Sequence, residues 1–178
     1  NTPTKQTNLR YIYLTAPLVC LIIILGSLFN YYLSSKADTD LSSIAILPFG
    51  NTIKDVDYEW LSQQFVDELT NELLGIKYFK IKDYSHVLNI WQSIEPSKGN
   101  LIDLALAQKI GKEMSTKYII YGNYLIFNKK QIRITSNLAD VDTGTILTSF
   151  QKTYEIVNLM DILDDFPGLF KQQIETVG

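Results

Sequence analysis

The sequence is poor in the residues from which most catalytic and metal sites are built. Its 178 residues include one cysteine, Cys20, and one histidine, His86. A disulfide within one chain and a zinc site made of cysteine and histidine are therefore excluded. A Ser-His-Asp triad would have to use His86, but the surrounding DYSHVLN contains no glycine-flanked serine nucleophile. We therefore expect no metal site, and we expect His86 on the surface of a helix.

Phosphate-binding features are scarce as well. Neither the GxGxxG motif nor the Walker A motif occurs, so no nucleotide cofactor is expected. The only arginines are Arg10 and Arg133. All 19 acidic residues lie at or after Asp38, together with 13 of the 16 basic residues, which gives this part a net charge of −6. Because an acidic, arginine-poor domain binds phosphate poorly, nucleic acid is not a predicted partner.

Charge is absent from residues 11–35, YIYLTAPLVCLIIILGSLFNYYLSS. Residues 11–33 would form a helix of about 35 Å, long enough to cross a hydrocarbon core of about 30 Å. Tyrosines stand near both ends, as in the aromatic belts of membrane proteins. We therefore predict a transmembrane helix at residues 11–33, between a flank at residues 1–10 and a linker at residues 34–42.

The residues that flank this run predict its orientation. Lys5 and Arg10 precede the run and only Lys36 closely follows it, so the positive-inside rule places residues 1–10 in the cytoplasm. A cleaved signal peptide is the alternative, because Ser35-Lys36-Ala37 has the small-x-small pattern of a cleavage site. Residues 43–178 are expected outside the cytoplasm in both cases.

The first elements after the linker are a strand and an amphipathic helix. The compact apolar run SIAILPFGN is typical of a buried strand. Asp57 is a possible cap for the helix that follows. The predicted buried stripe of that helix, at spacings of three and four, is Leu61, Phe65, Leu69, Leu73 and Ile76.

The remaining elements complete a small mixed α/β domain. YFKIKDY predicts a strand, SHVLNIWQSI a short helix and LIDLALAQKIGKEMS a longer one. Three consecutive strands follow, and the last helix contains Pro167-Gly168, which we expect to break or kink it. The predicted order is strand-helix-strand-helix-strand-strand-strand-helix. That order favours parallel pairs joined by right-handed crossovers, with an added antiparallel meander.

Four segments resemble the TolB amino-terminal-like domain family in order and spacing. They are SIAILPFGN, YEWLSQQFVDELTNELLGI, AQKIGKEMSTKYIIYGNYLI and QIRITSNLADVDTGTILTSFQKTYE, which cover about residues 43–155. Two stretches depart from the family pattern. Tyr121-Gly122-Asn123 stands where the family usually has Glu-Gly-Ser, and residues 65–69 match its Gly-Leu-Thr-Glu-Glu-Leu run weakly. These departures leave open a more distant relative of the curli-secretion lipoprotein type.

The resemblance implies a domain similar to the anticodon-binding domain of some tRNA synthetases, placed just outside a membrane helix. In that family the cytoplasmic side often carries a winged-helix regulator or a nucleotide cyclase, and tetratricopeptide repeats often follow. It therefore implies a protein-interaction or sensory domain of a transmembrane signalling or regulatory protein. That protein would cross the inner membrane once, place residues 43–178 in the periplasm, and not be an enzyme. The alternative is a free-standing envelope accessory protein.

The two tryptophans, Trp60 and Trp91, are possible anchors for a protein partner. Tryptophans in a domain of this size more often belong to the core than to an interaction surface. The core is therefore favoured for Trp91 too, but Trp91 lies between a short helix and the loop EPSKGN, which makes it the aromatic residue best placed for partial exposure and the candidate partner-binding residue. Trp60 is expected in the core.

Asp142-Thr143-Gly144 matches the signature around the catalytic carboxylate of aspartic proteases. That chemistry needs two carboxylates that share a proton. A second such motif is absent from the sequence, so only a homodimer could supply the pair. A hairpin turn needs only Gly144 at positive φ between two strands, and the resemblance places the same Thr-Gly in a turn. We expect the turn, with a dimeric aspartyl protease that uses Asp142 as the remote alternative.

Overall fold

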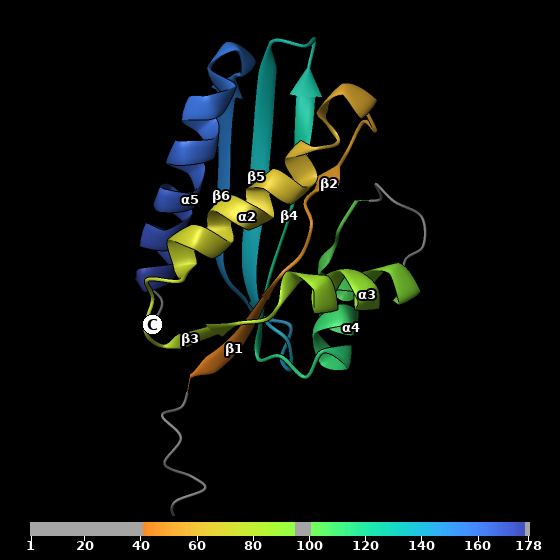
Figure 1. Cartoon of the computed structure of the whole chain (residues 1–178), viewed down its shortest axis with the longest axis vertical. Coiled ribbons are helices and arrows are strands. Elements are labelled where there is room, and N and C mark those ends of the chain that lie inside the picture. Colours follow the sequence, from red (N-terminus) through yellow and green to blue (C-terminus); the bar gives the residue numbers. More distant parts are fainter. Residues whose placement is uncertain (1–40, 95–100, 177–178) are drawn as a thin grey trace, which may run out of the picture. The chain divides into compact units, whose positions relative to one another are not determined.

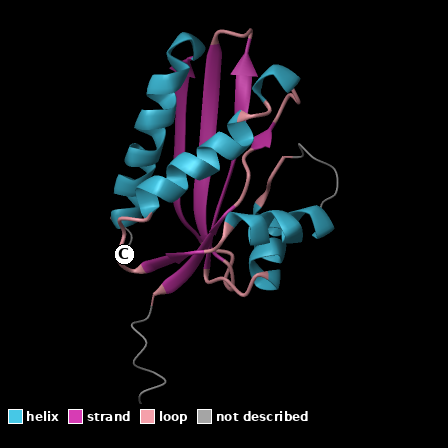
Figure 2. Cartoon of the chain, viewed as in Figure 1, coloured by secondary structure: helices cyan, strands magenta, loops and turns pink. Residues whose placement is uncertain are grey.

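The computed structural model describes residues 41–94 and 101–176. They belong to one compact unit that begins at Leu41. Within these residues, a six-stranded mixed sheet is covered by helices on both faces (Figures 1 and 2). The predicted class, a small mixed α/β domain, is confirmed for this part of the chain.

The sheet combines parallel and antiparallel pairs. Its strands are β1 (Ser42–Ile46), β2 (Gly50–Asn51), β3 (Phe79–Ile81), β4 (Tyr118–Phe127), β5 (Gln131–Asp140) and β6 (Ile146–Glu155). Their order is β3-β1-β4-β5-β6, and β2 also pairs with β4. β1 runs parallel to both β3 and β4, whereas β4, β5 and β6 form the expected antiparallel meander. The sequence patterns predicted every strand except the two-residue β2.

The helices lie in two layers. They are α2 (Leu61–Leu73), α3 (Tyr84–Ile94), α4 (Leu104–Glu113) and α5 (Leu159–Glu175), with short 3₁₀ turns η1 (Val56–Tyr58) and η2 (Ile156–Asn158). α2 and α5 cover one face of the sheet, and α3 and α4 cover the other face near β1 (Figure 1). The stripe predicted for the first helix is buried throughout, from Leu61 to Ile76. His86 is exposed on α3, as expected.

Aromatic side chains fill the layer between α2, α5 and the sheet. Phe166 of α5 stands at their centre and is fully buried. Its ring centroid lies 5.2 Å from Phe150, 5.6 Å from Phe65 and 5.8 Å from Phe49. Tilted and edge-to-face pairs at such separations add to the stabilisation from burial alone. This cluster joins both helices to β6 and to the segment after β1.

The expectation of a break at Pro167-Gly168 was wrong, because α5 continues through both residues. Pro167 lacks the amide that an interior helical residue normally donates to the preceding turn. Phe166 and Phe170, on either side of it, are both fully buried against the sheet. Packing of this stripe therefore outweighs the local cost of proline.

The expected capping role of Asp57 was also wrong. Asp57 lies within η1, where its amide donates to the carboxylate of Asp55 over 3.1 Å. α2 begins four residues later, and its cap position, Trp60, makes no side-chain capping hydrogen bond. The extra turn matters because it places Glu59 and Trp60 ahead of the helix.

The predictions for the amino-terminal part lie outside the described residues. They comprise the flank at residues 1–10, the transmembrane helix at residues 11–33 and most of the linker at residues 34–42. Among residues 41–94 and 101–176, no helix has both the length and the apolar character that a membrane crossing requires.

Candidate binding groove between α2 and α3

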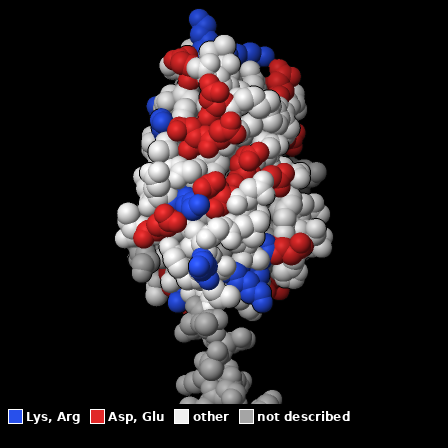
Figure 3. All heavy atoms as spheres, turned by 60° about the vertical axis from the view of Figure 1, so that its left-hand side comes forward, with Lys and Arg blue, Asp and Glu red and all other residues white. Residues whose placement is uncertain are grey.

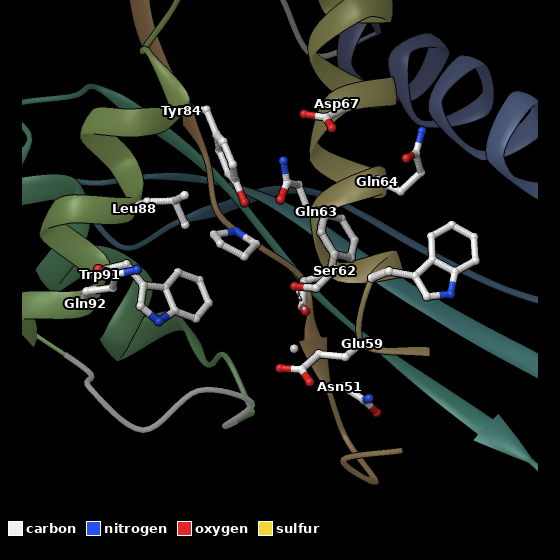
Figure 4. A pocket seen from close by; sticks show the side chains of 14 residues that line it. Asn51, Glu59, Ser62, Gln63, Gln64, Asp67, Tyr84, Leu88, Trp91 and Gln92 are labelled. Atoms are coloured by element: carbon white, nitrogen blue, oxygen red, sulfur yellow. Dashed lines mark hydrogen bonds between the residues drawn. The ribbon is translucent and has the colours of Figure 1, made fainter. Parts of the chain in front are cut away.

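A groove of about 980 Å³ opens between α2 and α3. Its floor is the segment at residues 48–51 that leads from β1 into β2 (Figure 4). Two hydrogen bonds join this floor to the start of α2: Ser62 Oγ donates to the Phe49 carbonyl over 2.6 Å, and the Phe49 amide donates to the Ser62 carbonyl over 3.3 Å. The floor and one wall are therefore held together.

The α2 wall is a row of polar side chains. Glu59, Gln63 and Asp67 line the groove at intervals of four residues. Glu59 and Trp60 have helical backbone angles, so the helical spacing extends back to Glu59. Residues at i and i+4 lie on one helix face. The buried stripe that contains Phe65 occupies another face, which leaves this row directed at the groove.

The α3 wall is largely apolar. It consists of Tyr84, Leu88, Trp91 and Gln92, which follow one another at spacings of four, three and one residues. Figure 4 shows Tyr84 and Asp67 at one end of the groove, and Trp91 and Glu59 toward the other. A polar wall thus faces an apolar wall.

Two hydrogen bonds hold the approach to the groove. The buried hydroxyl of Tyr124, on β4, donates to the Tyr58 carbonyl over 2.9 Å. This contact anchors η1, the turn that carries Glu59 and Trp60 to the rim. Asn51 Nδ2 donates to the Asp55 carbonyl over 2.9 Å and fixes the loop just before η1.

One of the two tryptophans departs from the core placement that the sequence favoured. Trp91 is only 7% exposed and packs in the core beneath α3 and α4, although it also borders the groove. This burial agrees with the favoured core placement, while a role of Trp91 in binding a partner stays a prediction. Trp60 is 46% exposed at the rim. Its position could have been inferred, because residue 60 lies outside the stripe of Leu61, Phe65 and Leu69.

The electrostatics of the groove are one-sided. Partial burial, and then the neighbouring charge of Glu68, raise the pKa of Asp67. Burial, and then the charge of Asp67, raise the pKa of Tyr84 to about 12. None of the residues that line the groove is a lysine or an arginine. The carboxylates of Glu59 and Asp67 are therefore not neutralised by the walls of the groove.

Acidic side chains also gather on the neighbouring surface (Figure 3). Within α2 and α5, Lys171 is the one basic residue, and its ammonium lies 2.9 Å from the Glu72 carboxylate. The acidic residues of these two helices are Asp67, Glu68, Glu72, Asp161, Asp164, Asp165 and Glu175. Asp67 belongs both to the groove and to this acidic set on the two helices.

The Asp142-Thr143-Gly144 motif forms the predicted turn between β5 and β6. Gly144 has a φ of 72°. The Asp140 carboxylate accepts from the Thr143 amide over 2.8 Å and from its hydroxyl over 2.9 Å. Asp142 is exposed and does not line the groove. In the described part of the chain, no cluster of three or more His, Cys, Asp or Glu side chains is placed to hold a metal ion.

Comparison with known proteins shows a shared fold. No protein-family model matches the chain, and no curated protein matches it. Lipoprotein GNA1162 from Neisseria meningitidis superposes with a TM-score of 0.51 at 14% identity, over 75% of this chain and 96% of that one. LpoB from Escherichia coli superposes with a TM-score of 0.51 at 17% identity, over 67% of this chain and 59% of that one. TolB from Acinetobacter baumannii superposes with a TM-score of 0.48 at 13% identity, over 76% of this chain and 28% of that one.

At these identities the likeness extends to the fold alone. The fold that the TolB resemblance implied is confirmed coarsely, as a mixed α/β domain like those of GNA1162 and LpoB. Membership of the TolB amino-terminal-like family itself stays a prediction.

Proposed function

We propose that residues 41–178 form a protein-binding domain of the bacterial envelope, which holds a segment of a partner protein in the α2–α3 groove. The observation that carries this proposal is the groove itself, of about 980 Å³, with exposed Trp60 at its rim. Concave sites with aromatic walls and a few polar groups are typical of binding sites. Tryptophan is also among the residues that contribute most to protein interfaces.

The chemistry of the groove favours binding over catalysis. Its titratable groups are carboxylates and a phenol, and the phenol of Tyr84 is held in its neutral form by a raised pKa. A nucleophile paired with a general base, which covalent catalysis needs, is not present among the lining residues. We therefore propose that the domain is not an enzyme, and that Asp142 serves the turn.

A free-standing envelope accessory protein is the form of this proposal that we favour. This chain covers 96% of lipoprotein GNA1162, so in that protein the fold makes up nearly the whole chain. A periplasmic location agrees with this likeness and with the uncharged run at residues 11–35.

The second form is the sensory part of a transmembrane regulator, with residues 11–33 as its single membrane helix. The length and lack of charge of this run support it. The mass and amino-terminal sequence of the native protein, isolated from membranes, separate the two forms. A large cytoplasmic domain upstream of Asn1 would support the regulator and overturn the free-standing form.

The binding proposal is tested by photo-cross-linking of the full chain in its native cells. A photoreactive residue replaces Gln92 on the groove, or Val157 as a control. Val157 is 85% exposed in η2 and does not line the groove. We expect a specific cross-linked product from position 92 and none from position 157. Equal products from both positions, or a product from position 157 alone, would overturn the proposal.

A further inference from the structure

The groove carries negative charge at its two ends on one wall. Glu59 and Asp67 are exposed, and neither makes a salt bridge or a side-chain hydrogen bond with residues 41–94 or 101–176. Gln63 lies between them in the same row. Other carboxylates of the acidic layer do have partners: Glu68 accepts from Gln64 over 2.7 Å, and Asp165 lies 2.9 Å from Lys152. The row along the groove therefore has unused capacity for a cation.

The spacing of the two carboxylates is informative. Eight helical residues separate Glu59 from Asp67, which corresponds to about 12 Å along the axis of α2. In an extended chain, residues i and i+4 lie on the same side and about 13 Å apart. Two cationic side chains four residues apart in an extended segment therefore match the two carboxylates.

The α3 wall determines which residues of the bound segment are favourable between the two cationic positions. Tyr84, Leu88 and Trp91 present a mostly apolar surface on α3. In an extended segment that lies along the groove, the side chains at i+1 and i+3 point away from those at i and i+4. They would therefore contact α3 while the cationic side chains reach α2. Apolar residues at these two positions would be buried favourably.

We infer that the groove binds an extended segment of a partner protein that carries lysine or arginine at positions i and i+4 and apolar residues at i+1 and i+3. This inference rests on the proposed function and specifies the chemistry of its ligand. The acceptor groups for the two cations are Glu59 and Asp67. The apolar positions pack on Tyr84, Leu88 and Trp91.

The pKa values of the groove agree with such a ligand. Partial burial raises the pKa of Asp67, so the carboxylate is less stable in its charged form than an ordinary aspartate. A bound cation would remove this penalty, because an opposite charge close by stabilises the ionised form. Burial, and then the charge of Asp67, raise the pKa of Tyr84. A cation bound at Asp67 would therefore favour the ionised form of this carboxyl.

Intrinsic fluorescence reports on this site directly, because both tryptophans of the chain line the groove. The probes are capped peptides without aromatic residues, titrated into the full chain in a non-ionic detergent. The first contains the sequence Lys-Leu-Ser-Leu-Lys. Glutamate replaces both lysines in the second, and serine replaces both leucines in the third.

We expect the lysine peptide to bind about tenfold more tightly than the glutamate peptide, since two exposed ion pairs each contribute about threefold or somewhat more. The serine peptide should lose about tenfold or more, because it buries less apolar surface. The double variant Glu59→Gln/Asp67→Asn should bind the lysine peptide about tenfold more weakly. The matched control, Asp161→Asn/Asp164→Asn, removes two exposed carboxylates of α5 and should change binding by less than about twofold.

Equal binding of the lysine and glutamate peptides, or equal losses in the two double variants, would overturn the inference. The proposed function would survive that result if the cross-link at position 92 persisted and depended on Trp60. Loss of that cross-link specificity would instead overturn the proposed function, and the inference with it. Circular dichroism of each variant shows that the fold is retained.

Discussion

Asp67 on α2 and Tyr84 at the start of α3 face each other across one end of the groove, and the charge of the carboxylate adds to the raised pKa of the phenol (Figure 4). The two residues thus lie close together although α2 and α3 cover opposite faces of the sheet. It also leaves the negative charge of Asp67, whose ionised form is disfavoured by the surrounding protein, without a cation among the lining residues. Such an arrangement costs stability in the free protein and favours a ligand that supplies the cation.

The first prediction concerns the stability effect of Asp67. Its pKa is raised in the folded state by burial and by Glu68, so the folded protein binds more protons than the unfolded chain between the two pKa values. Stability therefore falls as pH rises through that window. Asp67→Asn should raise the melting temperature at pH 7, and the gain should shrink in acid. Asp164→Asn, on α5, is the control. A lower melting temperature for Asp67→Asn at pH 7 would contradict the prediction.

The second prediction concerns Phe166, the centre of the aromatic cluster. Phe166→Ala should lower the free energy of unfolding by about 3–5 kcal/mol, because it leaves a cavity between Phe49, Phe65 and Phe150. Urea denaturation measures this loss. Val157→Ala should change the free energy of unfolding by less than about 0.5 kcal/mol, since surface substitutions seldom do more. A loss below about 1 kcal/mol for Phe166→Ala would show that the cluster is not packed as described.

The third prediction separates the two aspartates of the β5–β6 turn. The hydrogen bonds from Thr143 lower the pKa of Asp140, despite an opposing effect of burial. A lowered folded-state pKa stabilises the protein above the unfolded-state pKa, and this contribution is lost as pH falls through the folded-state pKa. Asp140→Ala should lower the free energy of unfolding by about 1 kcal/mol at pH 7, because the hydrogen bonds are lost, and by less in strong acid.

Asp142→Asn should leave both stability and partner cross-linking unchanged. A loss of function with an intact fold in Asp142→Asn would favour the protease alternative.

The fourth prediction links the sheet to the floor of the groove through Gly122. A Cβ at this position would meet the Thr135 carbonyl oxygen and would lie 2.5 Å from Phe49 Cε1. Gly122→Ala should therefore destabilise the protein by about 1–3 kcal/mol, because backbone and a core ring must both move. The displacement of Phe49 should also change the tryptophan fluorescence. Gly168→Ala, where a Cβ meets no atom within 4 Å, is the matched control.

Periodicity predicted the elements of the fold well. In the sequence of β5, Ile132, Ile134 and Leu138 are separated by even numbers of positions and so belong to one face of a strand, and all three are buried. The helical spacing of α2 was equally reliable, because each signal arises from residues close in sequence. The departure at Tyr121-Gly122-Asn123 also has a structural reason. The side chain of Asn123 accepts from the Ile102 backbone amide over 2.9 Å and donates to the Ile102 carbonyl over 3.0 Å. These two hydrogen bonds fix the segment before α4.

The groove could not be predicted in this way, because three segments distant in the sequence form it. The loop next to Trp91 makes this residue the candidate anchor in the sequence, and tertiary packing buries it in a cluster with residues of α4 and β4. Trp60 is expected in the core because most tryptophans of small domains lie there, yet η1 carries it to the rim. Pro167 shows the same limit, since burial of Phe166 and Phe170 maintains a helix that local propensity disfavours.

The most direct test of the binding role is the yield of cross-linked partner from position 92 in three backgrounds. With Trp60 unchanged, or with the conservative Trp60→Phe, we predict that the product forms. With Trp60→Ala it should fall at least about tenfold, as expected when an aromatic contact at an interface is removed. An undiminished product in the Trp60→Ala background, from a protein that retains its fold, would contradict the conclusion that the α2–α3 groove is the binding site.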